Sequence, residues 1–204
     1  MAQKSKKQVY QFKITLEEVM PTVWRRIRVS ENFTFWDLHV AIQNAMGWQD
    51  CHLHEWLCYD SENNEEVHLG IYPNEFEGQP EVIMDWEVPI KKYFLEKGTA
   101  IPYTYDFGDG WKHVVELEDI LQADSEETYP LCLAGENACP PEDVGGPLGY
   151  ADFVKAMDYK NHVDHQQMQE WHGKEFDSRH FEPGEVAFQN PKKRLDNMLN
   201  AGMM

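Results

Sequence analysis

Apolar and polar side chains alternate in two runs near the start of the chain. The apolar positions of the first run are Tyr10, Phe12, Ile14 and Leu16, and residues 23–29 repeat the pattern. A period of two is typical of a strand with one buried face, and a proline at position 21 marks a turn between the runs. We therefore predict an antiparallel hairpin. Three arginines lie near its middle: Arg25, Arg26 and Arg28.

The next segment, residues 34–47, has the period of a helix. Its apolar residues recur at spacings of three and four along one stripe: Leu38, Ala41, Ile42, Ala45 and Met46. Thr34 can cap the start of the helix, and Asp37 takes the place of the glutamate of a capping box. Gly47 suits the position after a helix. We predict a helix that packs on the sheet through its apolar stripe.

Residues 51–59 alternate again and predict a third strand. His52 and His54 then share one face, a geometry that metal sites use, although ordinary hydrogen-bonded histidines give the same pattern. The order strand, strand, helix, strand predicts an α+β fold. We expect a single roll or β-grasp-like domain, with a mainly antiparallel sheet, helices packed on one face and further helices at the C-terminal end.

The remaining pattern is less regular. Between residues 60 and 100 we expect an acidic loop, a second loop, a short strand and a short helix or turn, at 61–66, 73–80, 82–86 and 88–97 respectively. Three helices are expected near the end, at 150–157, 164–172 and 190–200, the last capped by Asn190. We expect residues 1–8 to form a disordered basic tail and residues 9–200 to form one domain.

An aromatic hairpin is predicted over residues 103–118, followed by an acidic linker. Asp109-Gly110 is a strong type I′ turn signal. If these two residues form the whole loop, Asp106 faces His113 with the Cβ atoms about 5 Å apart, which would hold a carboxylate beside an imidazole. A three-residue loop would instead pair Tyr105 with His113. We favour the first register.

A loop bounded by cysteines follows this hairpin. It runs from Cys132 to Cys139 and continues through two prolines to the glycines at positions 145, 146 and 149. No other stretch of the sequence places so many metal-capable or proton-transferring side chains between glycines and prolines. We expect the loop to fold back on the Asp109-Gly110 turn, so that the polar groups of both share one pocket.

The charge of the chain is strongly negative and unevenly spread. Net charge is −18 over 204 residues, yet residues 1–30 carry seven Lys or Arg against two Glu. The acidic remainder repels phosphate backbones, so broad nucleic-acid binding is not expected. There is no apolar run of about 18 residues that could span a membrane. Four cysteines without a secretory signal predict a cytoplasmic protein with reduced thiols.

Several motifs taken together resemble a known family. They are Tyr105-Asp-Phe-Gly-Asp-Gly-Trp-Lys-His113, Cys139-Pro-Pro-Glu-Asp-Val-Gly-Gly146, Trp24-Arg25-Arg26, Leu38-His39, Met46-Gly-Trp48 and His52-Leu-His54. This combination resembles the Ri-plasmid ORF-three-like family (the pRiA-type ORF-three domain) from about Tyr10 to Met157. The resemblance implies a compact α+β domain but no defined activity. Relatives include passenger proteins of insertion sequences, so it also implies a link to mobile elements.

One hypothesis for function is a metal site. Its nitrogen and sulfur ligands would come from His52, His54, His113, Cys132 and Cys139, with acidic residues completing the shell. Thiolate with imidazole suits zinc, and a shell of carboxylates alone suits magnesium or manganese. The alternative is that the thiols are small buried groups, while the acids serve turns and cap the following helix.

Two further hypotheses are an enzyme and a binding module. Acid–base chemistry would use Asp106, Asp109 and His113, but the sequence has no nucleophile elbow, phosphate loop or serine placed for a resolvase. We favour a module that binds an unknown protein or small ligand. Its surface would include Tyr105, Trp111, Arg25, Glu142 and Asp143, with Tyr103 and Tyr150 adding to an aromatic platform.

Overall fold

The computed structural model describes residues 7–71 and 81–200. The described strands are β1 (Gln8–Leu16), β2 (Trp24–Ser30), β3 (His54–Asp60), β4 (Glu65–Gly70), β5 (Val82–Met84), β6 (Ala100–Tyr105), β7 (Trp111–Gln122) and β8 (Leu131–Glu136). They form one sheet in the order β5-β4-β3-β6-β7-β1-β2-β8. Only the β4–β5 pair is parallel among the strand pairs of these residues. The predicted α+β class is confirmed.

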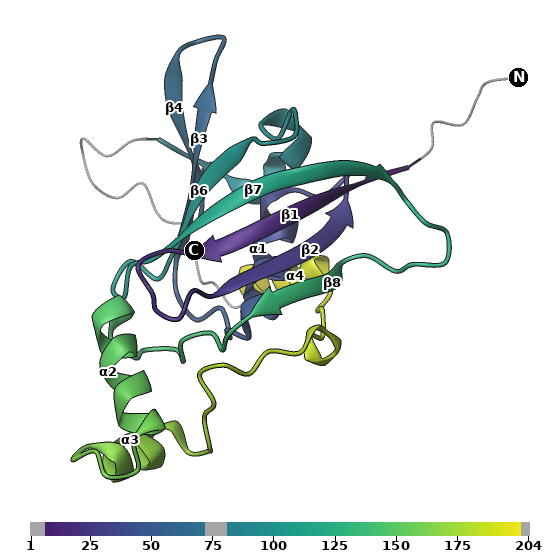
Figure 1. Cartoon of the computed structure of the whole chain (residues 1–204). Helices are drawn as coiled ribbons and strands as arrows, with labels where there is room; N and C mark the ends of the chain where they lie inside the picture. The colour runs from purple at the N-terminus through teal and green to yellow at the C-terminus, as the bar shows by residue number, and fades with distance from the viewer. Residues whose placement is uncertain (1–6, 72–80, 201–204) are drawn as a thin grey trace, which may run out of the picture.

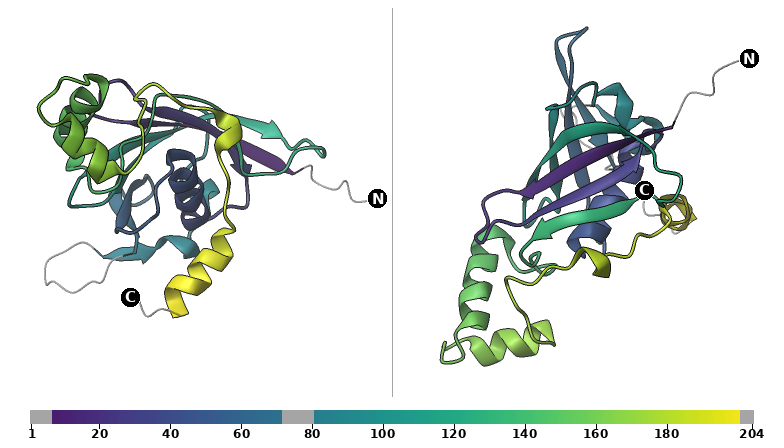
Figure 2. Two further views of the ribbon diagram at one scale, coloured as in Figure 1. Left: turned by 90° about the horizontal axis from the view of Figure 1, so that it is seen from below. Right: turned by 45° about the vertical axis from the view of Figure 1, so that its right-hand side comes forward.

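Helices lie on one face and at one end of this sheet. The described helices are α1 (Phe35–Met46), α2 (Gly146–Asp158), α3 (His165–His172) and α4 (Pro191–Asn200), with short 3₁₀ turns η1 (Asp85–Glu87), η2 (Ile90–Lys92) and η3 (Pro183–Glu185). Figure 1 shows α2 and α3 as a pair at one end of the molecule, and Figure 2 shows α1 beneath the strands with α4 near it. Among the described residues, no helix has the length and apolar character needed to cross a bilayer.

The first three elements agree with the sequence pattern. β1 pairs with β2 in an antiparallel hairpin. The side chain of Thr34 accepts a hydrogen bond from the backbone of Asp37, while the Asp37 carboxylate accepts one from the backbone of Thr34, so the capping box is complete. Gly47 has the left-handed backbone (φ 90°) that lets the chain leave α1.

Several boundaries differ from the prediction. Strand β4 lies partly in the expected acidic loop, where it forms a hairpin with β3. Strand β8 occupies part of the expected cysteine loop, because it is completed by hydrogen bonds to β2, which is distant in sequence. Strand β7 continues to Gln122 through the expected linker. Gln8 belongs to β1 rather than to a tail. Residues 1–6 of the expected tail lie outside the described residues, and so does the whole of the expected loop at 73–80.

The core lies between the sheet and α1. Its largest side chains are aromatic and fully buried: Trp56, Trp111, Tyr103, Tyr105 and Tyr150. The aromatic hairpin therefore faces inward. An exposed aromatic platform built from these rings, one basis for the binding-module hypothesis, is not present.

Candidate functional site

The turn of the β6–β7 hairpin is wider than either predicted register. Tyr105 pairs with Trp111 and Tyr103 with His113, so residues 106–110 form the loop and Asp106 does not face His113. The reason lies in Asp106 itself. It has a left-handed backbone (φ 54°), and its Oδ1 atom accepts hydrogen bonds from the backbone of Gly108 and Asp109 at 2.9 and 3.3 Å. A short side chain thus closes the loop in place of a tight turn.

This loop contacts the segment before α2. The backbone N–H of Gly145 donates to Asp109 Oδ2 at 3.1 Å. Gly146 lies so close that a Cβ atom there would be 2.5 Å from the carbonyl oxygen of Asp109. The turn and the proline-containing loop therefore meet as expected, and the contact brings Glu142 and Asp143 towards Asp106.

His52 lies at the centre of the acidic residues gathered by this contact. Its Nε2 atom is 3.0 Å from Asp143 Oδ1, 3.6 Å from Asp106 Oδ2 and 4.0 Å from Glu142 Oε2. The nitrogen is buried and forms no hydrogen bond, and the oxygens of Asp106 and Glu142 lie beyond hydrogen-bond distance from it. No Lys or Arg side chain within the described ranges forms an ion pair with these three carboxylates.

Two of the carboxylates are held in position by hydrogen bonds to the oxygen atom that does not face His52. Asp106 uses Oδ1 for the loop, which leaves Oδ2 on the side of His52. Glu142 Oε1 accepts hydrogen bonds from the backbone of Gln49 at 2.8 Å and from the hydroxyl of Tyr105 at 3.0 Å. Burial, followed by the charge of Glu142, raises the pKa of Tyr105, so this hydroxyl remains a donor. Such outer hydrogen bonds orient the inner ligands in metal sites.

The separations within the cluster suit one divalent cation. Metal–nitrogen and metal–oxygen bonds near 2.1 Å place neighbouring ligand atoms about 3.0 to 3.4 Å apart. Two of the three distances from His52 fall close to this range, and the third needs a small contraction. Close carboxylates repel one another without a cation between them. His52, Asp106 and Asp143 offer ligand atoms within 4.8 Å of one another, and Glu142 borders this group, 4.0 Å from His52. The first three side chains could therefore hold a metal ion, with Glu142 joining them after a small movement and positions left open for water.

A second group of possible ligands lies deeper in the protein. His39, Asp50 and His54 bring nitrogen and oxygen atoms within 4.8 Å of one another. The rings of His39 and His54 stack at 3.6 Å with an angle of 12° between their planes. Because the nitrogen lone pairs then lie in nearly parallel planes, they cannot both point at one ion. This group is better described as a hydrogen-bonded network than as a metal site.

Charges in this network are strongly coupled. His39 bonds to Asp50 Oδ1 at 2.8 Å, and Arg194 contacts Asp50 Oδ2 at 2.7 Å. Burial acts to raise the pKa of Asp50, but His39 and Arg194 outweigh it and the pKa falls to about 2. Burial lowers the pKa of His39. The network was not predicted, although His39 occupies an apolar stripe with Phe35, Ile42 and Met46 at helical spacing, which is a readable signal of a buried histidine.

His113 is not part of the carboxylate cluster. It is 1% exposed and packs edge-on against Trp48, with Nδ1 donating to the carbonyl of Tyr103 at 3.2 Å. Burial lowers the pKa of His113 to about 4. Trp111 and Tyr105 are also fully buried, and only the hydroxyl of Tyr105 reaches the cluster. The predicted contact between Asp106 and His113 is therefore wrong, because His113 pairs with Tyr103 instead.

Arg25 is buried rather than offered to a partner. Its guanidinium donates to four backbone carbonyls, those of Ala45, Trp24, Glu136 and Asn137, at 2.8 to 2.9 Å. The ring of Phe181 lies 3.7 Å from its central carbon. These contacts tie the strand β2, the end of α1 and the segment after α3 together. Arg25 thus has a structural role in the folded chain.

The cysteines do not meet His113. Within residues 7–71 and 81–200, the two groups with metal-ligand spacing contain neither Cys132 nor Cys139. Burial raises the pKa of both thiols, most strongly for Cys139. Cys132 is a small buried group, as the alternative interpretation of the sequence proposed, whereas Cys139 is partly buried and lines a cavity. His54 and His52 also separate, since His54 belongs to the deeper network.

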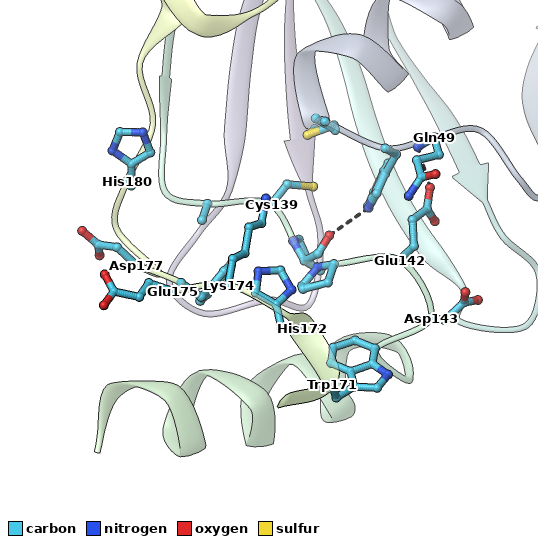
Figure 3. Close-up of a pocket in the computed structure, with 17 residues that line it drawn as sticks. Gln49, Cys139, Glu142, Asp143, Trp171, His172, Lys174, Glu175, Asp177 and His180 are labelled. Carbon is cyan, nitrogen blue, oxygen red and sulfur yellow. Dashed lines mark hydrogen bonds between the residues drawn. The ribbon is translucent and has the colours of Figure 1, made fainter. Parts of the chain in front are cut away.

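Two residues of the carboxylate cluster, Glu142 and Asp143, line a cavity of about 930 Å³, whereas His52 lines a second cavity. Figure 3 shows Glu142 directed towards Gln49 at the edge of the larger cavity, Asp143 pointing away from the centre, and His172 and Lys174 on the opposite wall. Trp48 donates its indole N–H to the carbonyl of Pro140 at 2.9 Å and fixes the floor. Glu142 and Asp143 therefore combine contact with His52 and access to solvent space.

The fold and these motifs define a family. The model of the plasmid pRiA4b ORF-3-like proteins matches residues 8–185, and the chain belongs to this family. The match includes all four residues of the carboxylate cluster and ends before α4.

Two relatives extend this assignment. An uncharacterised protein, y4hQ, from Sinorhizobium fredii is 34% identical over 191 residues, which cover 93% of this chain and 92% of that protein. The crystal structure of a protein of unknown function, MM3350, from Methanosarcina mazei matches with a TM-score of 0.80 and 35% identity. It covers 90% of this chain and 100% of the other.

Proposed function

We propose that this protein binds a divalent transition-metal ion through His52, Asp106, Glu142 and Asp143. The observation that carries the proposal is the buried Nε2 atom of His52, which faces three carboxylate oxygens and forms no hydrogen bond. One imidazole with several carboxylates suits Mn²⁺, Fe²⁺ or Zn²⁺ better than Ca²⁺. When bound, the ion would supply a Lewis acid that polarises water or a substrate oxygen.

The roles of the four residues follow from their surroundings. Asp106 and Glu142 are held by hydrogen bonds on their outer oxygens, so they supply a preformed half of the shell. Asp143 has a side chain that is 71% exposed, so it can move to the ion as it enters from solvent. This metal-binding function replaces the binding module built on the aromatic hairpin, since those rings are buried.

A matched pair of variants tests the proposal. Asp106→Asn keeps the shape and the loop hydrogen bonds but removes the ligand charge. Asp109→Asn makes the same change three residues away, at a carboxylate that does not face His52, and its amide oxygen can still accept the hydrogen bond from Gly145, so the contact between the loops is kept. Protein purified without an affinity tag is stripped with EDTA and titrated with Mn²⁺, using the electron paramagnetic resonance signal of the free ion, and with Zn²⁺ by calorimetry.

Wild type is expected to bind one equivalent of ion. Asp106→Asn should weaken the affinity by about tenfold or more, while Asp109→Asn should leave it unchanged. Thermal unfolding of the metal-free proteins checks that both variants are folded. Binding of less than a tenth of an equivalent by wild type, or equal losses in the two variants, would refute the site.

A further inference from the structure

A second cavity, of about 580 Å³, lies between α1, the start of β3 and α4. Its walls are mainly apolar and include Trp36, Leu53, Ile71 and Met198. The polar side chains in this lining are Asp50, His52, His54, Arg194 and Asn197. Ligand sites for small molecules commonly have this size and combine apolar walls with a few fixed polar atoms.

His54 has one fixed nitrogen and one free nitrogen. Its Nε2 atom lies 2.8 Å from Asp85 Oδ2, and the exposed fractions of the two residues are 2% and 0%. A carboxylate only accepts hydrogen bonds, so Nε2 carries a proton, and in the neutral ring Nδ1 then keeps a lone pair. Within the described residues, Nδ1 of His54 makes no hydrogen bond, although the ring lines the cavity.

The ring of His54 is also held in orientation. His39 stacks on it at 3.6 Å, and His39 is itself fixed at both nitrogens, by the hydroxyl of Tyr103 at 2.7 Å and by Asp50 at 2.8 Å. A hydrogen-bond acceptor fixed before a ligand arrives loses little entropy on binding. The second carboxylate oxygen of Asp85 is buried without a partner, so Asp85 is committed to His54 alone.

We propose that this cavity binds a compact, mainly apolar molecule with one hydroxyl group, and that His54 Nδ1 accepts the hydrogen bond of that hydroxyl. A carboxylate head group could approach Arg194, but this guanidinium is already engaged by Asp50 and by the carbonyl of Gln49, and the carboxylate would lie beside the like charge of Asp50. An ammonium group would bring a charge into apolar surroundings at a large desolvation cost. A neutral donor on an apolar body fits the walls and the free lone pair. His52 borders both this cavity and the carboxylate cluster, but the hydroxyl site requires no metal ion.

Two probes of equal shape test the proposal in protein kept metal-free with EDTA. p-Cresol carries the hydroxyl, and p-xylene has a methyl group in its place. Calorimetry with wild type should give p-cresol an affinity about tenfold higher than p-xylene, since the xylene complex leaves the acceptor unpaired. Nitrogen-15 spectra of the histidine rings should show the proton of free His54 on Nε2.

Two variants test separate parts of the proposal, the hydrogen bond and the cavity. In Asp85→Asn, the amide can donate to Nε2, which moves the ring proton to Nδ1 and removes the preference for p-cresol. Met198→Trp fills the cavity and should abolish binding of both probes. Leu199→Trp, on the same helix at a side chain that is 39% exposed, is the control and should bind like wild type. Unfolding temperatures confirm that each variant is folded.

Three outcomes would overturn the proposal. The first is that wild type binds the two probes with equal affinity, or binds neither. The second is a ring proton on Nδ1 of His54 in wild type. The third is binding of p-cresol that Met198→Trp leaves intact. Because all titrations contain EDTA, none of these outcomes depends on the metal site. Loss of metal binding in Asp106→Asn would likewise leave this cavity unaffected.

Discussion

The hydroxyl of Tyr105 donates a 3.0 Å hydrogen bond to Glu142 from a ring that is completely buried. The same hydroxyl accepts the backbone N–H of Cys51 at 3.0 Å. Tyr105 therefore links the core of the sheet to the carboxylate cluster and fixes one oxygen of Glu142 before any ion arrives. It is a positioning residue for the proposed metal site.

Tyr105→Phe should weaken Mn²⁺ affinity by about tenfold, because an outer hydrogen bond of a ligand is lost. Tyr150→Phe is the control, since its buried hydroxyl donates to the carbonyl of Ala138 at 2.8 Å and does not reach the cluster. Both variants should lose about 1 kcal/mol of unfolding free energy. Equal metal affinities in the two variants would remove Tyr105 from the site.

Arg25→Lys should destabilise the fold by about 3 kcal/mol. A lysine keeps the charge but cannot satisfy the four carbonyls that the planar guanidinium reaches, and buried acceptors without partners are costly. Arg28→Lys changes a partly exposed arginine that contacts Gln11 and Glu127, so it should cost less than about 1 kcal/mol. Urea unfolding of the two variants compares them directly, and similar losses would contradict the structural role of Arg25.

His113 should make the fold sensitive to acid. Its pKa of about 4 in the folded chain lies below the ordinary value of 6.5, so protons bind the unfolded chain more readily. The free energy of unfolding is therefore highest above pH 6.5, where His113 is neutral in both states. It decreases as the pH falls from 6.5 towards 4, because the unfolded chain takes up a proton at His113 and the folded chain does not. The loss approaches about 3 kcal/mol. His113→Leu should flatten unfolding free energy over this range, and an unchanged pH profile would argue against burial of the ring.

Gly146→Ala should separate the two loops that form the site. Gly146 and Gly110 both have left-handed backbones, with φ of 70° and 69°, so alanine costs about 1 kcal/mol at either position. Only at Gly146 does the new Cβ atom also meet the Asp109 carbonyl, whereas the space around Gly110 is open. Gly146→Ala should therefore lose more unfolding free energy than Gly110→Ala, and also metal affinity. Equal effects would contradict the close approach.

The sequence pattern predicted those elements whose caps, turns and apolar positions all lie within one short segment. The helix from Thr34 to Gly47 has its cap, stripe and terminal glycine in sequence, and the first hairpin has its turn between two alternating runs. Strand β8 could not be found in this way, because its partner β2 is distant in sequence. Strand β4 pairs with its neighbour β3, but Glu65 and Glu66 gave its first half the composition of a loop. The Asp109-Gly110 signal misled for a related reason: the side chain of Asp106 competes with it and closes a wider loop.

The candidate site was predicted in part. The region was found, since His52, Asp106, Glu142 and Asp143 had all been selected and lie together. Its chemistry was not, because the burial of His113 and of the thiols depends on packing against Trp48 and Arg25. Asp85 gave no signal of its own. It lies in an irregular stretch, and only the fold brings it to His54.

Helix α4 supplies Arg194 and Met198 to one wall of the smaller cavity, whereas all four proposed metal ligands lie before residue 144. During synthesis on a ribosome, a nascent chain would therefore expose the complete ion-binding set some fifty residues before the wall of the second cavity emerges. The proposed metal ligands are therefore synthesised before the wall of the smaller cavity, so that a metal ion could bind before the cavity closes around a small molecule.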